Sequence, residues 1–264
     1  MATTTCKACD DPLILEIQDD DEDTGAGSSS APQSVPDDLE LPCGCHFHWQ
    51  CLLDQAAEVA TSLKCPSCGS PLATTNTSAS ASIVTRYTSE GGVDADLDIL
   101  PALAEEAYLA ANPAARPARA FHVMCAEGDA EGIVDLLRDA DSNPSSNEEE
   151  EEPSMPVPRL LRYQDPLAHG KSGLHLAVER GQEEVVWLLL WVASALPARA
   201  FPEAAVRGAL ALGLQQRPGT APAEDIRALT DDRGRTAEAV ATEIGAGGPW
   251  AAVLPAGVLH PGNC

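Results

Sequence analysis

The chain has 264 residues, a formal net charge of −25 and an aromatic content of only 4%. This length allows one or two domains with at least one conventional hydrophobic core. The acidic charge argues against nucleic-acid binding and against anionic membranes, because both surfaces recruit Lys and Arg.

The first residues lack the basic and apolar regions of a signal peptide. The longest apolar run, Val185 to Leu196, is too short to span a bilayer. We therefore expect an intracellular protein of the cytoplasm or nucleus. In such a reducing compartment, closely spaced cysteines are more typical of metal binding than of disulfides.

Eight potential zinc ligands fall in four close pairs near the start of the chain. They are Cys6, Cys9, Cys43, Cys45, His48, Cys51, Cys65 and Cys68. A structural zinc ion is usually closed by four Cys or His side chains, so the series predicts two Zn²⁺ ions. Between the first and second pairs we expect a disordered acidic insert at about 18–38, rich in Asp, Gly, Ser and Pro.

The order and spacing of these pairs resemble a RING finger over roughly residues 1–72. Local sequence agrees with the resemblance in Leu41-Pro42-Cys43-Gly44, Phe47-His48 and Cys65-Pro66. The resemblance implies a small α+β cross-brace, in which alternate pairs share a metal. On this basis Cys6, Cys9, His48 and Cys51 would bind one ion, and Cys43, Cys45, Cys65 and Cys68 the other.

Two alternatives remain at this point. Most RING fingers have His where Cys45 stands, and the adjacent His46 is an alternative ligand. The same ligand order is also that of a PHD finger, a reader of histone tails. That family has a longer gap before its His and a Trp shortly before its last Cys pair, and this chain has neither.

The resemblance implies a ubiquitin ligase in which no side chain of the zinc domain is catalytic. Such a domain binds a ubiquitin-conjugating enzyme and orients its ubiquitin thioester. The apolar docking surface would come from the zinc loops and the helix between them: Ala8, Leu13, Ile14, Leu52, Leu63 and Pro66. Active members often carry Arg or Lys after the last Cys, where this chain has Gly69.

The rest of the chain is expected to be a linker at 73–97 followed by helices at 98–258. Three weakly similar segments recur there, and in each a glycine stands seven positions after the first residue: Phe121 to Gly128, Leu174 to Gly181, and Glu238 to Gly245. The clearest copy, residues 165–193, resembles an ankyrin repeat. The copies are more widely spaced than in that family, so we expect insertions at about 139–158 and 193–230.

Several residues of the helical part have a structural interpretation. In the ankyrin pattern, His122 and His175 would order the turn before a helix through hydrogen bonds. We expect Cys125 to be a small buried residue, and Trp187 and Trp191 to serve packing or partner contact.

The sequence therefore predicts a small α+β zinc cross-brace domain followed by an all-α, ankyrin-like helical repeat stack. The expected function is that of a RING-type ubiquitin ligase that holds a protein substrate or adaptor on its repeats. The alternative is a non-catalytic protein-interaction adaptor with a structural zinc domain. We expect neither a nucleic acid nor a membrane as a partner.

Overall fold

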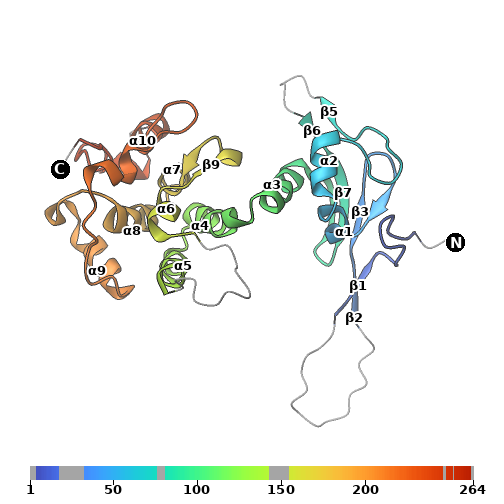
Figure 1. Cartoon of the computed structure of the whole chain (residues 1–264), viewed down its shortest axis with the longest axis horizontal. Coiled ribbons are helices and arrows are strands. Elements are labelled where there is room, and N and C mark those ends of the chain that lie inside the picture. The colour runs from blue at the N-terminus through green and yellow to red at the C-terminus, as the bar shows by residue number, and fades with distance from the viewer. Residues whose placement is uncertain are drawn as a thin grey trace, which may run out of the picture. The chain divides into compact units, whose positions relative to one another are not determined.

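The computed structural model describes residues 4–17, 33–75, 81–142, 155–245, 248–251 and 253–262. The chain divides into two compact units, Met1–Asn112 and Pro113–Cys264 (Figure 1). The first unit combines short strands with helices, and the second is mainly helical. Within the described residues, no helix has the length and apolar character needed to cross a membrane.

The first unit contains eight described strands and three described helices. The strands are β1 (Ile14–Ile17), β2 (Gln33–Pro36), β3 (Asp38–Glu40), β4 (His46–Phe47), β5 (Thr74–Thr75), β6 (Ala81–Ser82), β7 (Val84–Ser89) and β8 (Gly92–Asp98). The helices are α1 (Trp49–Leu53), α2 (Ala56–Ser62) and α3 (Leu100–Ala111). Four strands form an antiparallel sheet in the order β4-β3-β7-β8, while β1 pairs with β2 and β5 with β6.

A small core holds these elements together. It joins side chains from the sheet and the three helices, among them Leu39, Phe47, Leu52, Val59, Ile83 and Leu103, all at most 1% exposed. Helix α3 packs against α2, and its Leu103 is part of this core. Burial of such side chains is the main stabilising contribution that this unit has apart from metal.

The structure differs from the expectation for residues 73–112. The range expected as a linker contains β7 and β8, and the helix expected to open the second unit is α3 of the first. The Ser- and Thr-rich composition concealed strand β7, which pairs on one side with β8 and on the other with β3, far earlier in the chain (Leu39 is opposite Tyr87). Strands β2 and β3 likewise occupy residues 33–40, at the end of the expected acidic insert, whose other residues (18–32) lie outside the described ranges.

The second unit is built mainly from helices. They are α4 (Arg116–Glu127), α5 (Ala130–Ser142), α6 (Val157–Leu161), α7 (Gly173–Arg180), α8 (Glu183–Ala193), α9 (Glu203–Ala211) and α10 (Ala237–Ile244), with a small hairpin of β9 (Gln164–Asp165) and β10 (Lys171–Ser172). Helix α4 packs on α5 and α7, and α7 packs on α8 and α10.

The three recurring glycines end three of these helices. Gly128 follows α4 with φ +89°, Gly181 follows α7 with φ +74°, and Gly245 follows α10 with φ +95°. Gly128 and Gly181 are left-handed and Gly245 is extended, and glycine adopts a positive φ in both cases without a steric penalty. The repeated spacing in the sequence therefore predicted three helix ends correctly. The structure shows a helical second unit.

The residues at the start of helix α7, Ser172, Gly173 and His175, each have a structural role. The side chain of Ser172 hydrogen-bonds Nδ1 of His175 (2.8 Å), and Nε2 of His175 bonds the Arg235 carbonyl (2.9 Å). A side chain at Gly173 would meet Phe121 at 2.7 Å and Cys125 at 2.9 Å. His175 thus has the structural role expected of it, and Gly173 permits close approach of α4.

His122 differs from His175. It is 1% exposed, and its Nδ1 lies 3.9 Å from Asp165, which also pairs with Arg119. Neither of its ring nitrogens makes a hydrogen bond within the described part of the chain. The turn-ordering bonds expected for His122 are therefore not seen among the described residues.

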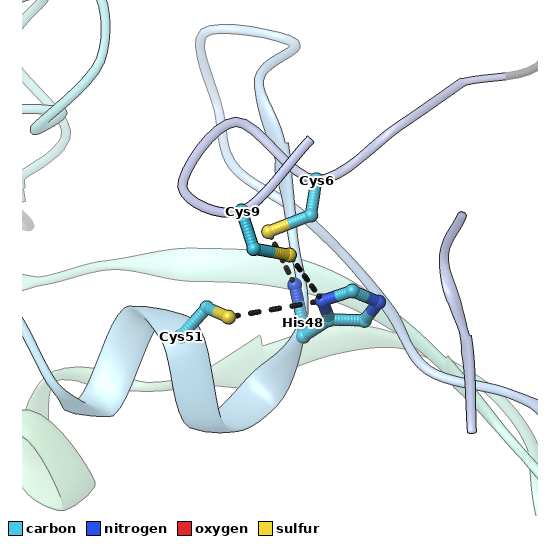
Figure 2. A group of neighbouring side chains, drawn as sticks. All are labelled: Cys6, Cys9, His48 and Cys51. Atoms are coloured by element: carbon cyan, nitrogen blue, oxygen red, sulfur yellow. Dashed lines mark hydrogen bonds between the residues drawn. The ribbon is translucent and has the colours of Figure 1, made fainter. Parts of the chain in front are cut away.

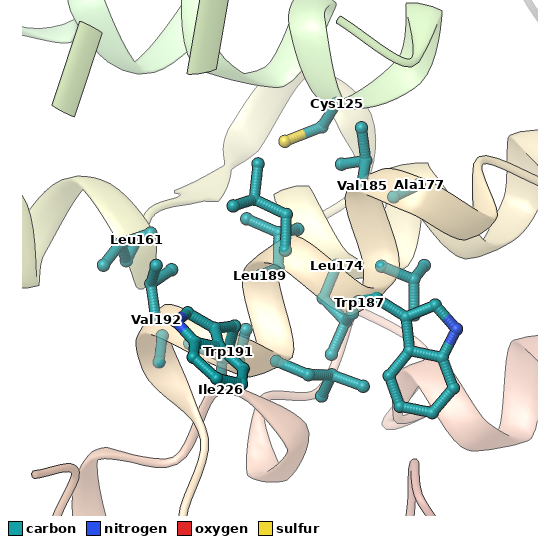
Figure 3. Packing of buried hydrophobic residues seen from close by; sticks show 14 of the residues in the cluster. Cys125, Leu161, Leu174, Ala177, Val185, Trp187, Leu189, Trp191, Val192 and Ile226 are labelled. Carbon is teal, nitrogen blue, oxygen red and sulfur yellow. The ribbon is translucent and has the colours of Figure 1, made fainter. Parts of the chain in front are cut away.

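The core of the second unit surrounds α8 (Figure 3). Cys125 is fully buried, as expected, and burial raises the pKa of its thiol. Trp187 and Trp191 are at most 9% exposed, and both contact Phe201, with ring centroids 5.9 and 5.2 Å apart. Both tryptophans therefore contribute to packing.

Part of the expected insertion at 193–230 is packed structure. It contains α9, and its side chains Phe201, Ala209, Ile226 and Leu229 belong to the core. Arg217 lies over the Phe201 ring and donates to the carbonyls of Trp191 (3.0 Å) and Ser194 (2.7 Å) at the end of α8. These bonds satisfy carbonyls that a helix leaves without partners at its C-terminus. Of the other expected insertion, residues 143–154 lie outside the described ranges.

Candidate metal centres

Two tight turns present the first and last Cys pairs. In the first, the Asp10 amide bonds the Cys6 carbonyl (3.0 Å); in the last, the Gly69 amide bonds the Cys65 carbonyl (2.9 Å). The residue after each second cysteine has a left-handed backbone, with φ +66° at Asp10 and +71° at Gly69. This turn places both sulfurs of a pair on one side.

The second and third pairs flank strand β4. Gly44, between Cys43 and Cys45, has φ +78° and closes a turn by donating to the Leu41 carbonyl. His48 stands at the N-terminus of α1, which places Cys51 one helical turn later. Strand β4, the Gly44 turn and helix α1 therefore fix the positions of both pairs.

The structure brings the eight residues together in two groups of four. Cys6, Cys9, His48 and Cys51 form one, and Cys43, Cys45, Cys65 and Cys68 form the other. Within each group all ligand atoms lie within 4.8 Å of one another. Alternate pairs along the sequence thus share a group, which is the arrangement that the cross-brace implies.

Two distances within the first group are close to those found around a tetrahedral zinc ion (Figure 2). Nδ1 of His48 lies 3.3 Å from the Cys9 sulfur and 3.7 Å from the Cys51 sulfur. Standard Zn–S and Zn–N bond lengths place ligand atoms about 3.6 Å apart around a tetrahedral ion. The atoms therefore already surround one common centre.

The orientation of His48 is set from outside the group. Its Nε2 lies 2.8 Å from the Pro12 carbonyl, to which it donates when it carries the ring proton. Nδ1 is then left unprotonated and faces the three sulfurs. Such a bond from the second ring nitrogen is typical of histidines that bind metal. The residues present therefore fit a zinc ion.

The second group consists of four sulfurs in different surroundings. Burial raises the pKa of Cys45 to about 12, whereas hydrogen bonds from the Ser70 side chain and amide lower the pKa of Cys68 to about 6. Zinc binds thiolates, so its binding releases the protons of the groups that are still thiols. Four thiolates of this kind are a common structural zinc site.

His46, the alternative ligand, lies outside both groups. Its Nδ1 is 2.7 Å from an oxygen of Asp38, which lies on the neighbouring strand β3, where Glu40 is the residue directly opposite His46. The geometry therefore assigns the ligand position to Cys45.

Sequence reasoning missed Asp37, which supports the first group. Its carboxylate is buried and accepts from the Trp49 amide (3.2 Å) and the Tyr87 hydroxyl (3.0 Å). Burial, together with this bond, raises the pKa of Tyr87 to about 12. Asp37 thereby joins β7 to the first residue of α1, directly after His48. It stands in an acidic segment, and no local pattern distinguished it.

The expected docking surface needs a correction. Leu52 is 0% exposed and Leu13 is 8% exposed, because both pack in the core of the first unit. Ala8 and Ile14 are exposed, and Leu63 and Pro66 are partly exposed. Only the last four can contribute to a surface that a partner contacts without rearrangement.

No protein-family model, curated protein or solved structure matched the chain. The conclusion on its class therefore rests on the site itself. The fold and the two groups define a protein with two sites that can each hold one zinc ion, placed in a small sheet-containing unit that precedes a helical one.

Proposed function

We propose that the chain is a RING-type ubiquitin ligase, with two structural zinc ions and no catalytic side chain of its own. The observation that carries the proposal is the interleaved grouping of the four pairs. In RING fingers this grouping builds a rigid platform for a ubiquitin-conjugating enzyme. The first unit would hold that enzyme's ubiquitin thioester in a reactive pose, and the rate gain would come from orientation.

In this proposal the second unit binds the protein substrate or an adaptor. Support comes from the recurring helix ends at Gly128, Gly181 and Gly245 and from the His175 bonds, which are features of ankyrin-like repeats. Repeats of this kind offer extended surfaces for protein partners. The exposed side chains of Ala8 and Ile14, with Leu63 and Pro66, are the candidate contacts for the conjugating enzyme.

The test measures discharge of ubiquitin from a panel of charged conjugating enzymes onto free lysine, which requires no acceptor on the chain. Zinc-loaded protein should accelerate discharge with at least one enzyme. Cys45→Ser should abolish the effect, and the adjacent change His46→Ala should preserve it. Absence of acceleration across the panel, with protein that carries two zinc ions, would refute ligase activity.

The non-catalytic adaptor is a second candidate, favoured by Gly69 and by the burial of Leu13 and Leu52. A side chain at position 69 would meet no atom within 4 Å, but the backbone there has φ +71°. Gly69→Arg should increase discharge if the chain is a ligase that lacks only this basic residue. Gly69→Ala imposes the same backbone cost without the charge and should not. If the chain is an adaptor, neither substitution should change the rate of ubiquitin discharge.

A further inference from the structure

Basic residues are distributed very differently in the two units. Residues 1–112 contain two lysines, Lys7 and Lys64, and one arginine, Arg86. Residues 113–264 contain one lysine, Lys171, and twelve arginines. A general preference for arginine would affect both units alike. The second unit, in particular, is almost free of primary amines.

Structural demand accounts for some of these arginines. Arg227 is buried, pairs with Asp225 (2.6 Å) and donates to the carbonyl of His260 (2.8 Å). Arg217 caps α8, and Arg235 bonds both Asp231 and Glu243. Each uses several donors of one planar guanidinium, and a lysine ammonium could not reproduce that geometry.

Other arginines have no such demand. Apart from Arg116 and Arg138, which are also exposed, these are the exposed residues Arg159, Arg180, Arg199, Arg207 and Arg233. Arg207, for example, is 71% exposed and makes a surface pair with Glu203 at 3.5 Å. A lysine would serve equally well for solubility and for such a pair. The difference from lysine that matters for ubiquitin transfer is that arginine has no amine that can be acylated under physiological conditions.

The single lysine of the second unit is held by a partner. Nζ of Lys171 lies 2.6 Å from a carboxylate oxygen of Glu179, and the lysine side chain is only 15% exposed. The Glu179 carboxylate and the low exposure of the side chain therefore limit access to the only lysine amine of this unit.

We propose that the second unit lacks lysine amines that can accept ubiquitin. Ubiquitin then passes to a lysine of the bound partner and not to the unit that holds this partner. This rests on the proposed ligase function. In the transfer, a neutral lysine amine attacks the thioester carbonyl. The new C–N bond forms, the C–S bond breaks, the thiolate leaves on the conjugating enzyme, and the amine releases a proton. Only an accessible amine close to the thioester can take part.

The first arm of the test is independent of ligase activity. The folded, zinc-loaded chain is treated with an amine-acylating ester, and each lysine is followed by mass spectrometry. Lys64 is exposed and should react freely, whereas Lys171 should react about five-fold or more slowly because its Nζ lies against Glu179 and its side chain is only 15% exposed. In denaturant the two rates should become equal. Equal rates in the folded chain would overturn the proposal.

The second arm adds amines to the second unit. Arg199→Lys and Arg207→Lys retain the charge, with Arg199→Gln and Arg207→Gln as matched controls. In the ubiquitin-transfer assay, the wild-type second unit and the Gln variants should remain unmodified, and the Lys variants should carry ubiquitin at the new position. Active discharge onto free lysine without modification at position 199 or 207 would overturn the proposal. No discharge at all would refute the ligase function instead, and the acylation rates would still decide whether the unit lacks a reactive amine.

Discussion

His46 and His48 lie two positions apart, yet their ring nitrogens have different partners. His48 is oriented by the Pro12 carbonyl toward three sulfurs, and His46 is paired with Asp38. Residue type and spacing indicated that metal ligands were present near Phe47. Only the contacts of each side chain determine which residues face the metal.

We expect Cys45→Ser and His46→Ala to differ in their zinc content. Cys45 belongs to the group of four sulfurs, so its loss leaves an open zinc site. Native mass spectrometry should find one zinc ion in Cys45→Ser and two in His46→Ala. The reverse result would make His46 the ligand.

The buried pair Arg227–Asp225 should be sensitive to the loss of one partner. Arg227 is 0% exposed and Asp225 is 2% exposed. Arg227→Gln leaves a buried carboxylate unpaired and should cost about 3–5 kcal/mol of unfolding free energy, measured by denaturant titration. Arg207→Gln, at an exposed position, should stay within about 0.5 kcal/mol of the wild type. Equal costs would contradict the burial of this pair.

Local signals predicted some elements and not others. Helix ends at Gly128, Gly181 and Gly245 followed from residue type and a constant separation. Strand β7 did not, because one of its two partners, β3, is distant in sequence, and its Ser and Thr residues masked the hairpin that it forms with β8. The four ligand pairs were predictable because zinc chemistry restricts both residue type and spacing. The supporting Asp37 was not, because its role depends on contacts between elements that are distant in sequence.

Three turns of the second unit depend on carboxylates and should make this unit sensitive to acid. Asp165, Asp225 and Asp231 each accept a backbone amide two residues later. Although burial opposes the shift, hydrogen bonds lower the pKa of all three, that of Asp231 to about 2. A carboxylate with a lowered pKa stabilises the fold above its unfolded pKa, near 4, and this contribution is lost as the pH falls toward 2.

The thermal unfolding midpoint of the second unit should therefore decrease as the pH is lowered from 5 to 2. Trp49→Phe leaves Trp187, Trp191 and Trp250, all in this unit, as fluorescence probes. In Asp231→Asn the decrease should be smaller, because one titrating group is removed. A midpoint that does not change with pH would contradict the role of these carboxylates.

At the scale of the whole molecule, the two units have different sources of stability. The second has a core of its own around α8, and the first has a small core next to two metal sites. Structural zinc can contribute about 10–16 kcal/mol to the folding of such a unit. Removal of zinc should therefore unfold the first unit and leave the second folded.

Hydrogen exchange with and without a strong chelator checks this expectation. Amides of α1 and α2 should lose protection when zinc is removed, and amides of α7 and α8 should retain it. Loss of protection in both units at the same chelator concentration would contradict their independence.

The central claim is that alternate Cys/His pairs share a metal, and the zinc content of one double variant tests it most directly. In Cys6→Ser/Cys51→Ser both changes fall in the same group of the structure. Native mass spectrometry should find one zinc ion in this variant, and none in the matched variant Cys6→Ser/Cys43→Ser, which affects both groups. If each zinc ion were instead bound by consecutive pairs, the two results would be exchanged, and that outcome would contradict the cross-brace.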